Sequence, residues 1–109
     1  MSQNDAVLTP GHAPGTRYAL VEASWHADIV QQARDAFLQE MAACGVPSEA
    51  IDVIDVPGAF EVPLHVKRLA HSGRYAAVVA SALVVDDGTY RHDFMAASVI
   101  DALMRVQLE

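Results

Sequence analysis

The stretch YAAVVASALVV, residues 75–85, is apolar almost throughout and shows no alternation of polar and apolar side chains. Such a run predicts a strand that is buried on both faces, as is typical of the centre of a parallel sheet. We therefore expect a central parallel strand here. The rest of the chain has to supply its neighbours and the helices that cover them.

The segments that precede and follow this run alternate between strand and helix patterns. Short apolar runs at residues 18–21 and 51–56 predict two further strands, and the aspartates of the second run indicate a position near a sheet edge. Apolar residues spaced three and four apart predict helices over residues 28–44, 61–71 and 90–108. This βαβαβα order predicts the α/β class, a three-layer sandwich in which helices cover both faces of a parallel sheet.

Two of these helices have an apolar side that we expect to be buried. On the first helix it comprises Ile29, Val30, Ala33, Phe37, Met41 and Cys44, and on the last Phe94, Ala97, Ile100, Met104 and Leu108. Asp101 and Arg105 are four residues apart and are expected to pair on the exposed side of the last helix. Cys44 is the only cysteine, which excludes a disulfide framework within the chain.

The composition indicates a single domain with an acidic surface. Of the 109 residues 52% are apolar, and the formal net charge is −7, which argues against binding to nucleic acid or to anionic membranes. No apolar run is long enough to span a bilayer, and the first residues lack the pattern of a secretory signal, so we expect a cytoplasmic protein. Residues 1–16, with two prolines and two glycines, are expected to form a flexible arm before an α/β domain at residues 17–109.

Unusual residues gather directly after each predicted strand. They are Ser24-Trp25-His26 after the first, the run VPGAFE at residues 56–61 after the second, and residues 85–92 after the third. Binding sites in parallel α/β folds lie at the carboxyl ends of the strands, where these three segments would meet. We therefore expect a site at this edge of the sheet.

Two residues in the first two segments suggest a ligand with a flat ring and hydroxyl groups. The indole of Trp25 can stack on a heterocycle, although a position in the core would suit it equally well. Glu61 can accept hydrogen bonds from hydroxyls, although a carboxylate at a helix start also compensates the helix dipole. His26 is expected to be a solvated loop residue.

The third segment has the groups needed for a phosphate and for proton transfer. Gly88 and Thr89 open a helix whose first amides suit an anion. Arg91 adds positive charge, and His92 can move protons near neutral pH. No metal site is expected, because the chain has neither paired cysteines nor an HxxxH motif. Three histidines are assigned no role: His12, His65 and His71.

Together these segments resemble the lumazine synthases. The resemblance runs from Tyr18 to Glu109 and is carried by three motifs: ASWH at residues 23–26, VPGAFEVP at 56–63 and ALVVDDGTYRHDF at 82–94. The last motif is similar to the divergent type II branch of this family. The resemblance implies a flavodoxin-like sheet and a place in riboflavin biosynthesis.

Lumazine synthases condense 5-amino-6-(D-ribitylamino)uracil with 3,4-dihydroxy-2-butanone 4-phosphate to 6,7-dimethyl-8-ribityllumazine. The resemblance therefore implies a transferase with two small-molecule substrates and no cofactor, acting as a homo-oligomer, either a pentamer or a dimer of pentamers. The residues that it implies are Trp25, Ala59, Phe60 and Glu61 for the pyrimidine and its ribityl chain, Leu83, Val84 and Val85 for the pyrimidine edge, and Gly88 and Thr89 for the phosphate.

Two departures from the family pattern alter these expectations. The family's proton-donating histidine aligns with Arg91, and His92 lies one residue later, so proton transfer is assigned to either Arg91 or His92. The family also continues beyond Glu109 into a fourth strand and two helices. We therefore expect residues 17–109 to be a C-terminally incomplete domain, whose activity depends on the further segment.

These departures favour an alternative interpretation, a non-catalytic protein on the same fold that binds flavin or lumazine or serves assembly. Trp25, Glu61 and the Gly88-Thr89 pair favour the enzyme. Turnover of both substrates distinguishes the two.

Overall fold

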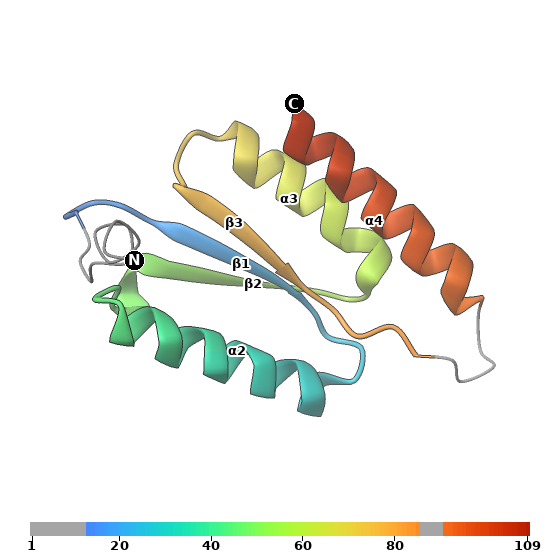
Figure 1. The fold of residues 1–109 in the computed structure, drawn as a ribbon, viewed down its shortest axis with the longest axis horizontal. Coiled ribbons are helices and arrows are strands. Elements are labelled where there is room, and N and C mark those ends of the chain that lie inside the picture. Colours follow the sequence, from blue (N-terminus) through green and yellow to red (C-terminus); the bar gives the residue numbers. More distant parts are fainter. Residues whose placement is uncertain (1–12, 86–90) are drawn as a thin grey trace, which may run out of the picture.

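The computed structural model describes residues 13–85 and 91–109, in which strands and helices alternate (Figure 1). The elements in chain order are β1 (Tyr18–Ala23), α2 (Ala27–Ala43), the 3-10 helix η1 (Ser48–Ala50), β2 (Ile51–Val56), the 3-10 helix η2 (Ala59–Glu61), α3 (Val62–His71), β3 (Ala77–Ser81) and α4 (His92–Leu108). The α/β class expected from the sequence is confirmed.

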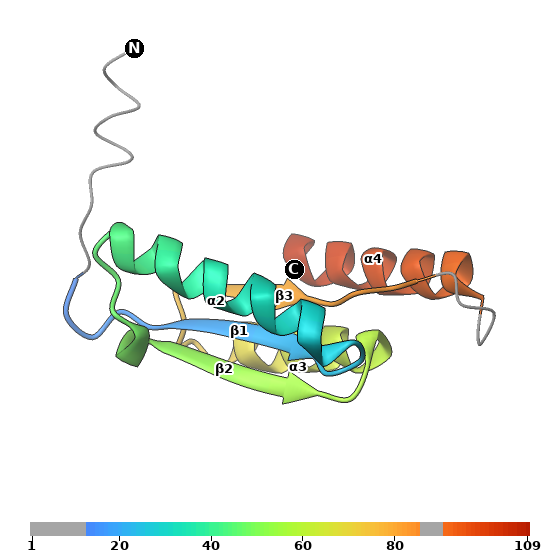
Figure 2. The ribbon, with the colours of Figure 1, turned by 90° about the horizontal axis from the view of Figure 1, so that it is seen from below.

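The three strands form one parallel sheet in the order β2-β1-β3. Leu20 of β1 is in register with Val53 of β2 on one side and with Val79 of β3 on the other. Helix α2 covers one face of the sheet and α3 covers the other, with α4 lying beside α3 (Figures 1 and 2). All but the first residue of β1 is buried, as its short apolar run predicts.

The prediction of a central strand at residues 75–85 is wrong in two respects. Only Ala77–Ser81 forms β3, and β3 lies at an edge of the described sheet with two of its five residues exposed. An apolar run without alternation indicates two covered faces, but it does not say on which sides hydrogen-bonded neighbours lie. Among the described strands, β1 is the central one.

The main core lies between the sheet and α3. Val21 and Ala23 of β1 pack there with Val56, the last residue of β2, and with Val62 and Val66 of α3. Burying these apolar side chains is the main favourable contribution to folding. Because Ala23 and Val56 end their strands, the same packing fixes the start of α3 at the carboxyl edge of the sheet.

The amino-terminal ends of the strands are joined through Asp52 of β2. Arg17, which precedes β1, donates to its Oδ1, and the hydroxyl of Tyr75, which precedes β3, donates to its Oδ2 at 2.6 Å. The hydrogen bond from Tyr75 is the main cause that holds the pKa of Asp52 below its usual value, and the hydrogen bond from Arg17 adds to it. The contact stabilises the sheet at the end remote from its carboxyl edge.

Helix α2 begins and ends within one residue of the prediction, but its apolar side is only partly buried. On that side Val30 is buried and Phe37 and Met41 are half-buried, whereas three residues are exposed: Ile29, Ala33 and Cys44. Cys44 lies past the last helical residue, where its N–H donates back to the carbonyl of Glu40. The expectation that Cys44 is buried is therefore wrong.

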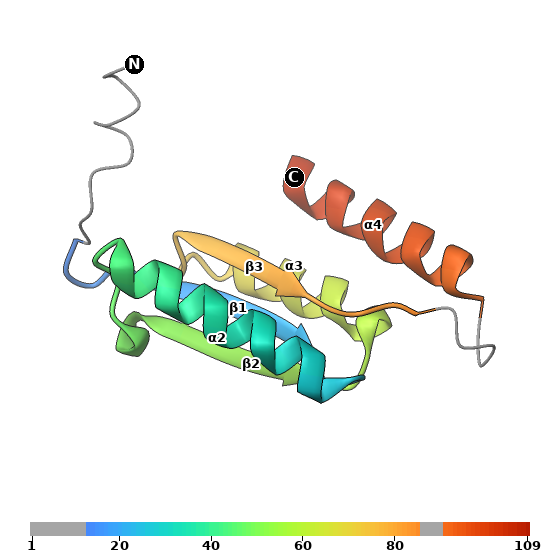
Figure 3. The same cartoon turned by 60° about the horizontal axis from the view of Figure 1, so that its bottom comes forward.

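Helix α4 packs with a different side from the one predicted. The residues predicted to be buried are all exposed: Phe94, Ala97, Ile100, Met104 and Leu108. The packed side carries Val99, Leu103 and Val106 instead. Figure 3 shows the ribbon with α2 in front of the sheet and α3 behind it. Helix α4 has apolar residues on both sides, so the spacing of apolar residues did not identify the side that packs.

The outer surface of α4 is otherwise as expected. Arg105 Nη2 lies 3.4 Å from Asp101 Oδ2, which confirms the predicted pair. None of the helices in the described ranges has the length and apolar content needed to cross a membrane.

A carboxylate is buried beneath α2. Glu22 of β1 is only 4% exposed and is in register with Asp55 of β2. Arg34 of α2 approaches it, with Nη1 3.4 Å from Glu22 Oε2. Burial, followed by the hydrogen bond and the charge of Asp55, raises the pKa of Glu22 to about 7 against the opposing effect of Arg34. Glu22 therefore titrates in a range where an exposed glutamate is already ionised.

Candidate functional site

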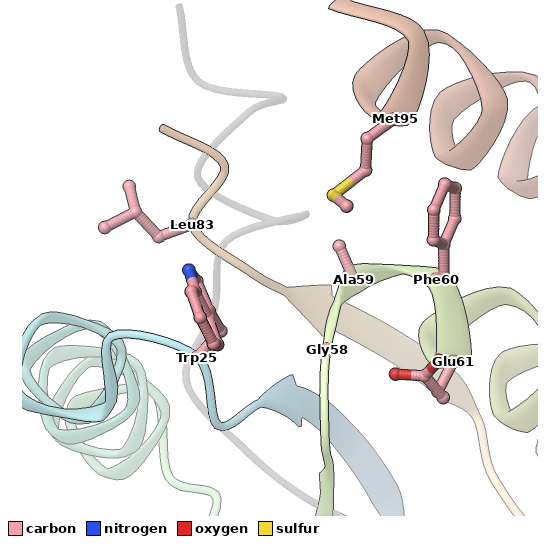
Figure 4. Close-up of a pocket in the computed structure, with 7 residues that line it drawn as sticks. All are labelled: Trp25, Gly58, Ala59, Phe60, Glu61, Leu83 and Met95. Atoms are coloured by element: carbon pink, nitrogen blue, oxygen red, sulfur yellow. The ribbon is translucent and has the colours of Figure 1, made fainter. Parts of the chain in front are cut away.

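A cavity of about 200 Å³ lies at the carboxyl edge of the sheet (Figure 4). The residues that line it follow β1, β2 and β3 or belong to α4: Trp25, Gly58, Ala59, Phe60, Glu61, Leu83 and Met95. Residues that follow all three strands thus contribute to one cavity, as the parallel order of the strands requires. The described members of the third segment singled out in the sequence, Val85, Arg91 and His92, do not line it. Five residues expected at a site line it together: Trp25, Ala59, Phe60, Glu61 and Leu83.

Strand pairing brings Trp25 to this cavity. Ala23 and Val56 are the last paired residues of β1 and β2, and the N–H of Ser24 donates to the carbonyl of Val56 at 2.7 Å. The next residue, Trp25, therefore emerges beside the segment that follows β2. Its side chain is 46% exposed, so it is not a core tryptophan.

Gly58 and Glu61 are held close together by a short turn. The N–H of Glu61 donates to the carbonyl of Gly58 at 3.2 Å, and the Glu61 carboxylate points back toward Gly58 (Figure 4). Gly58 is extended (φ −151°), a conformation that any residue can adopt. A Cβ at this position would, however, lie 3.2 Å from Glu61 Oε1, so the glycine is needed for the close approach of the carboxylate.

The walls of the cavity are mainly apolar. Trp25 and Leu83 lie on one side, Phe60 and Met95 lie on the other, and Ala59 lies between them (Figure 4). A cavity of about 150 Å³ is known to hold a ring the size of benzene. The present cavity can therefore take one heterocyclic ring, and any longer substituent of that ring has to extend through its mouth.

Sequence reasoning did not assign two of the lining residues to the site. Gly58 lies in the run at residues 56–61 but was assigned no role, although a glycine before a helix start often marks a close approach of other atoms. Met95 lies on α4, on the side of the helix that was not expected to pack. Only the placement of α4 shows that Met95 reaches the cavity.

His26 also differs from the expectation of a solvated loop residue. Its Nε2 is buried without a hydrogen-bond partner among the described residues, and its ring packs edge-on to the Trp25 ring with centroids 5.5 Å apart. The expectation was wrong because the chain turns sharply at His26 and begins α2 directly after it.

Four further residues were expected at the site. Two of them line no part of this cavity, and two lie outside the residues that the structure describes. Val84 lines a separate hollow of about 210 Å³ between β3 and α4, and Val85 lines neither hollow. Gly88 and Thr89 lie outside the described residues.

Arg91 and His92 lie at the start of α4, one helical turn before the cavity. The N–H of Met95 donates to the carbonyl of Arg91 at 3.0 Å, which links the two positions. The guanidinium of Arg91 is 3.3 Å from an Asp93 carboxylate oxygen and 4.0 Å from the centre of the Phe94 ring. Its hydrogen bond to Asp93 is the main cause that lowers the pKa of Asp93.

The described residues contain no cluster of three or more His, Cys, Asp or Glu side chains that would hold a metal ion. The charged side chain in the cavity lining is instead Glu61, and the Trp25 indole adds a ring N–H. Such a set suits a neutral, hydroxyl-bearing ligand with a flat ring.

Comparison with known proteins agrees with this geometry. Residues 15–109 match the family described as 6,7-dimethyl-8-ribityllumazine synthase. A protein of this name from Rhodococcus erythropolis is 56% identical over 95 residues, which is 87% of this chain and 61% of the relative.

Two further relatives are named 6,7-dimethyl-8-ribityllumazine synthase 2. The protein from Pseudomonas syringae pv. tomato is 56% identical over 96 residues, covering 88% of this chain and 56% of the relative. The protein from Bradyrhizobium diazoefficiens is 50% identical over 103 residues, covering 94% of this chain and 61% of the relative.

The chain thus spans 56–61% of the length of these three relatives. The matched part includes every residue that lines the cavity. With this coverage and identity, the chain belongs to the 6,7-dimethyl-8-ribityllumazine synthase family.

Proposed function

We propose that this chain forms the ring-binding part of an active site that condenses 5-amino-6-(D-ribitylamino)uracil with 3,4-dihydroxy-2-butanone 4-phosphate. The product is 6,7-dimethyl-8-ribityllumazine. The observation that carries the proposal is the single cavity lined by residues from all three strand ends, in a chain of this family. Its volume suits the pyrimidine ring and leaves the ribityl chain to extend outward.

The pyrimidine ring stacks on Trp25, and its edge meets the backbone near Leu83. Both residues line the same side of the cavity, which supports this arrangement. Val84 and Val85, which follow Leu83, contribute backbone groups at the same edge. Stacking of a base on an aromatic side chain contributes about 1–3 kcal/mol.

The ribityl chain passes Ala59 and Phe60 toward the carboxylate of Glu61. A carboxylate accepts hydrogen bonds only, so it suits the hydroxyls of a sugar alcohol. The place of Glu61 in the cavity lining supports this role.

The butanone phosphate binds near the start of α4. Gly88 and Thr89 provide backbone and hydroxyl donors, and Arg91 provides positive charge that offsets the acidic chain. Arg91 lies one turn from Met95 and therefore within reach of a substrate that extends out of the cavity.

The chemistry consists of two condensations and one elimination. The amino group of the pyrimidine attacks the ketone and, with loss of water, forms an imine. Phosphate then leaves, and the ribitylamine nitrogen closes the second ring with loss of a second water. His92 carries the protons that these steps exchange, and Arg91 stabilises the departing phosphate.

Most of the rate enhancement comes from holding the two substrates together. Fixing two reactants in a reactive geometry contributes up to about 7–11 kcal/mol. Proton transfer by a positioned group adds about 10²–10⁴-fold. No step transfers electrons, so the reaction itself calls for no redox cofactor.

We further propose that the protein acts as a homo-oligomer, a pentamer or a dimer of pentamers. The support is the exposed apolar side of α4, which comprises Phe94, Ile100, Met104 and Leu108. Exposed apolar surface of this extent is typical of a side that another chain covers.

Turnover of both substrates by the full-length protein tests the enzymatic proposal. We expect lumazine and inorganic phosphate in equal amounts, and neither product when one substrate is omitted. Arg105→Ala, a substitution at an exposed arginine on the outer side of α4, serves as a control and should leave the rate unchanged. Tight binding of riboflavin without any turnover would contradict the enzyme and support the non-catalytic alternative.

A further inference from the structure

The residue after the stacking tryptophan has an unusual backbone conformation. His26 has φ 59° and ψ 53°, and among the described residues it is the only one other than glycine with a positive φ. Residues other than glycine are uncommon in this left-handed region because their Cβ is crowded there, and histidine is, with asparagine and aspartate, among those that adopt it most often. His26 can therefore form this turn, and its ring is then placed by the packing around it.

The turn starts α2 directly behind Trp25. The carbonyl of His26 accepts hydrogen bonds from the N–H groups of Ile29 and Val30, both at 3.1 Å. The chain therefore leaves the end of β1, passes Trp25 and reverses within a single residue. Trp25 therefore lies before this turn and borders the cavity, whereas α2 begins after it.

The imidazole of His26 contacts the indole. The two ring planes are perpendicular, and their centroids are 5.5 Å apart, which is a favourable edge-to-face geometry. The imidazole Nε2 is buried and has no hydrogen-bond partner within the described residues. Packing, and not a hydrogen bond at Nε2, thus holds the ring against the indole.

We infer that His26 is a positioning residue that holds the Trp25 indole at the cavity wall before a ligand binds. This inference rests on the proposed function, in which the pyrimidine ring stacks on Trp25. A half-exposed tryptophan at the end of a strand would otherwise sample several rotamers. Ordering it on binding costs affinity, and ordering it in advance avoids that cost.

Three substitutions distinguish the effect of the His26 backbone conformation from the effect of its ring. His26→Asn and His26→Gly tolerate the left-handed conformation but remove the imidazole. His26→Phe keeps an aromatic ring beside the indole. His71→Asn is the matched control, because His71 is exposed at the end of α3 and its Nε2 lies 2.8 Å from Oε1 of Glu109, which follows α4.

The first measurement is the time-resolved fluorescence anisotropy of Trp25 in the unliganded full-length protein. Trp25 is the only tryptophan in these 109 residues, and subtracting the signal of the Trp25→Phe variant isolates its emission. We expect a larger amplitude of fast indole motion in His26→Asn and His26→Gly. His26→Phe should restore most of the restriction, and His71→Asn should match the wild type.

The second measurement is the affinity for riboflavin, used as a probe with a flat ring and a ribityl chain. His26→Asn should bind it about two- to tenfold more weakly, as expected for the loss of one aromatic contact. His26→Phe should recover most of the affinity. Unchanged anisotropy in both His26→Asn and His26→Gly would overturn the inference, whatever the affinities.

The two measurements also separate this inference from the proposed function. If Trp25→Ala leaves riboflavin affinity unchanged, stacking at Trp25 is wrong, but the anisotropy of the His26 variants still decides whether His26 orients the indole. If Trp25→Ala weakens binding and the anisotropy of His26→Asn is unchanged, only the role of His26 is wrong.

Discussion

Glycine at position 58 sets the place of a single carboxylate. Its backbone is extended, so alanine is compatible with the fold, but the added Cβ would lie 3.2 Å from Glu61 Oε1. That distance is shorter than an ordinary van der Waals contact, and the exposed Glu61 side chain has room to rotate away. The substitution therefore acts on the site and spares the fold.

We predict that Gly58→Ala changes the free energy of unfolding by no more than about 0.5 kcal/mol. Its affinity for the ribityl-aminopyrimidine should fall by about 1 kcal/mol, because the displaced carboxylate loses a hydrogen bond to the ribityl chain. Isothermal titration calorimetry measures this loss. In the Glu61→Ala background the same substitution should have no further effect, and an equal loss there would show that Gly58 acts independently of Glu61.

Arg91 and His92 are expected to divide phosphate binding and proton transfer between them. Arg91 stays protonated at all working pH values and is therefore a poor proton donor. We predict that Arg91→Ala raises the KM for the sugar phosphate about tenfold or more, because one charge-assisted hydrogen bond to the phosphate is lost. The effect on kcat should be smaller. His92→Ala should lower kcat by about 10²-fold or more and change that KM little.

Steady-state kinetics with each substrate varied in turn measures both effects. Arg105→Ala on the outer side of the same helix should behave as the wild type. If Arg91→Ala lowers kcat and His92→Ala raises the KM, the two roles are reversed.

At the level of elements, the strands and helices could be predicted where local pattern determines them. The limits of α2 and α3 follow from apolar spacing and from the glycines that end them, and both agree with the structure within one or two residues. The packed side of α4 could not be predicted, because the helix has apolar residues around most of its circumference and only contact with α3 selects Val99, Leu103 and Val106.

Some residues of the candidate site could likewise be predicted from the sequence, and others could not. Trp25 and Glu61 could be predicted because parallel strands bring their carboxyl ends together, whereas Ala59, Phe60 and Leu83 were expected only from the resemblance to lumazine synthases. Met95 and the packing of the His26 ring against Trp25 could not, since both depend on how a helix is placed against the sheet. Local sequence carries no information about such tertiary contacts.

The buried carboxylate between β1, β2 and α2 makes the stability of these elements depend on pH. The pKa of Glu22 is raised from 4.5 to about 7, first by burial and then by Asp55, so the folded state keeps its proton where the unfolded state has lost it. This contribution to stability is fully present below pH 4.5 and is lost as the pH rises to about 7. Its size is on the order of 3 kcal/mol, because each unit of pKa corresponds to about 1.4 kcal/mol.

We predict that Glu22→Gln removes this dependence. Glutamine is neutral at every pH and can still accept a hydrogen bond from Arg34, as protonated Glu22 does. The variant should match the wild type near pH 4.5 and exceed it in unfolding free energy at pH 8. Urea unfolding across this range measures the difference, with exposed Glu49→Gln as the control. A constant difference between wild type and Glu22→Gln at all pH values would contradict the role of burial.

At the scale of the whole molecule, two apolar surfaces lie side by side. One is the edge of β3 that pairs with no other strand of the described residues and borders a groove of about 630 Å³ between β3, α3 and α4. The other is the exposed side of α4 with Phe94, Ile100, Met104 and Leu108. Strand edges with unpaired backbone groups invite pairing with other chains, and exposed apolar sides of this extent associate in water.

We predict that residues 1–109, expressed without further residues, form heterogeneous oligomers and do not turn over the two substrates. Extending the chain with the C-terminal segment of a relative should give a discrete assembly and restore activity. Light scattering and the product assay measure these properties. Ile100→Lys, which charges the exposed side of α4, should reduce association if that side contributes. A discrete, active species of residues 1–109 would contradict the prediction.

The central claim is that the cavity between the strand ends binds the pyrimidine ring by stacking on Trp25. The most direct test is the affinity of the full-length protein for 5-amino-6-(D-ribitylamino)uracil, measured by calorimetry in wild type, Trp25→Phe and Trp25→Ala. We predict that Trp25→Ala binds about 1–3 kcal/mol more weakly, that Trp25→Phe retains most of the affinity, and that the free energy of unfolding of both changes little, because the indole is half-exposed. An affinity of Trp25→Ala equal to that of the wild type would contradict the claim.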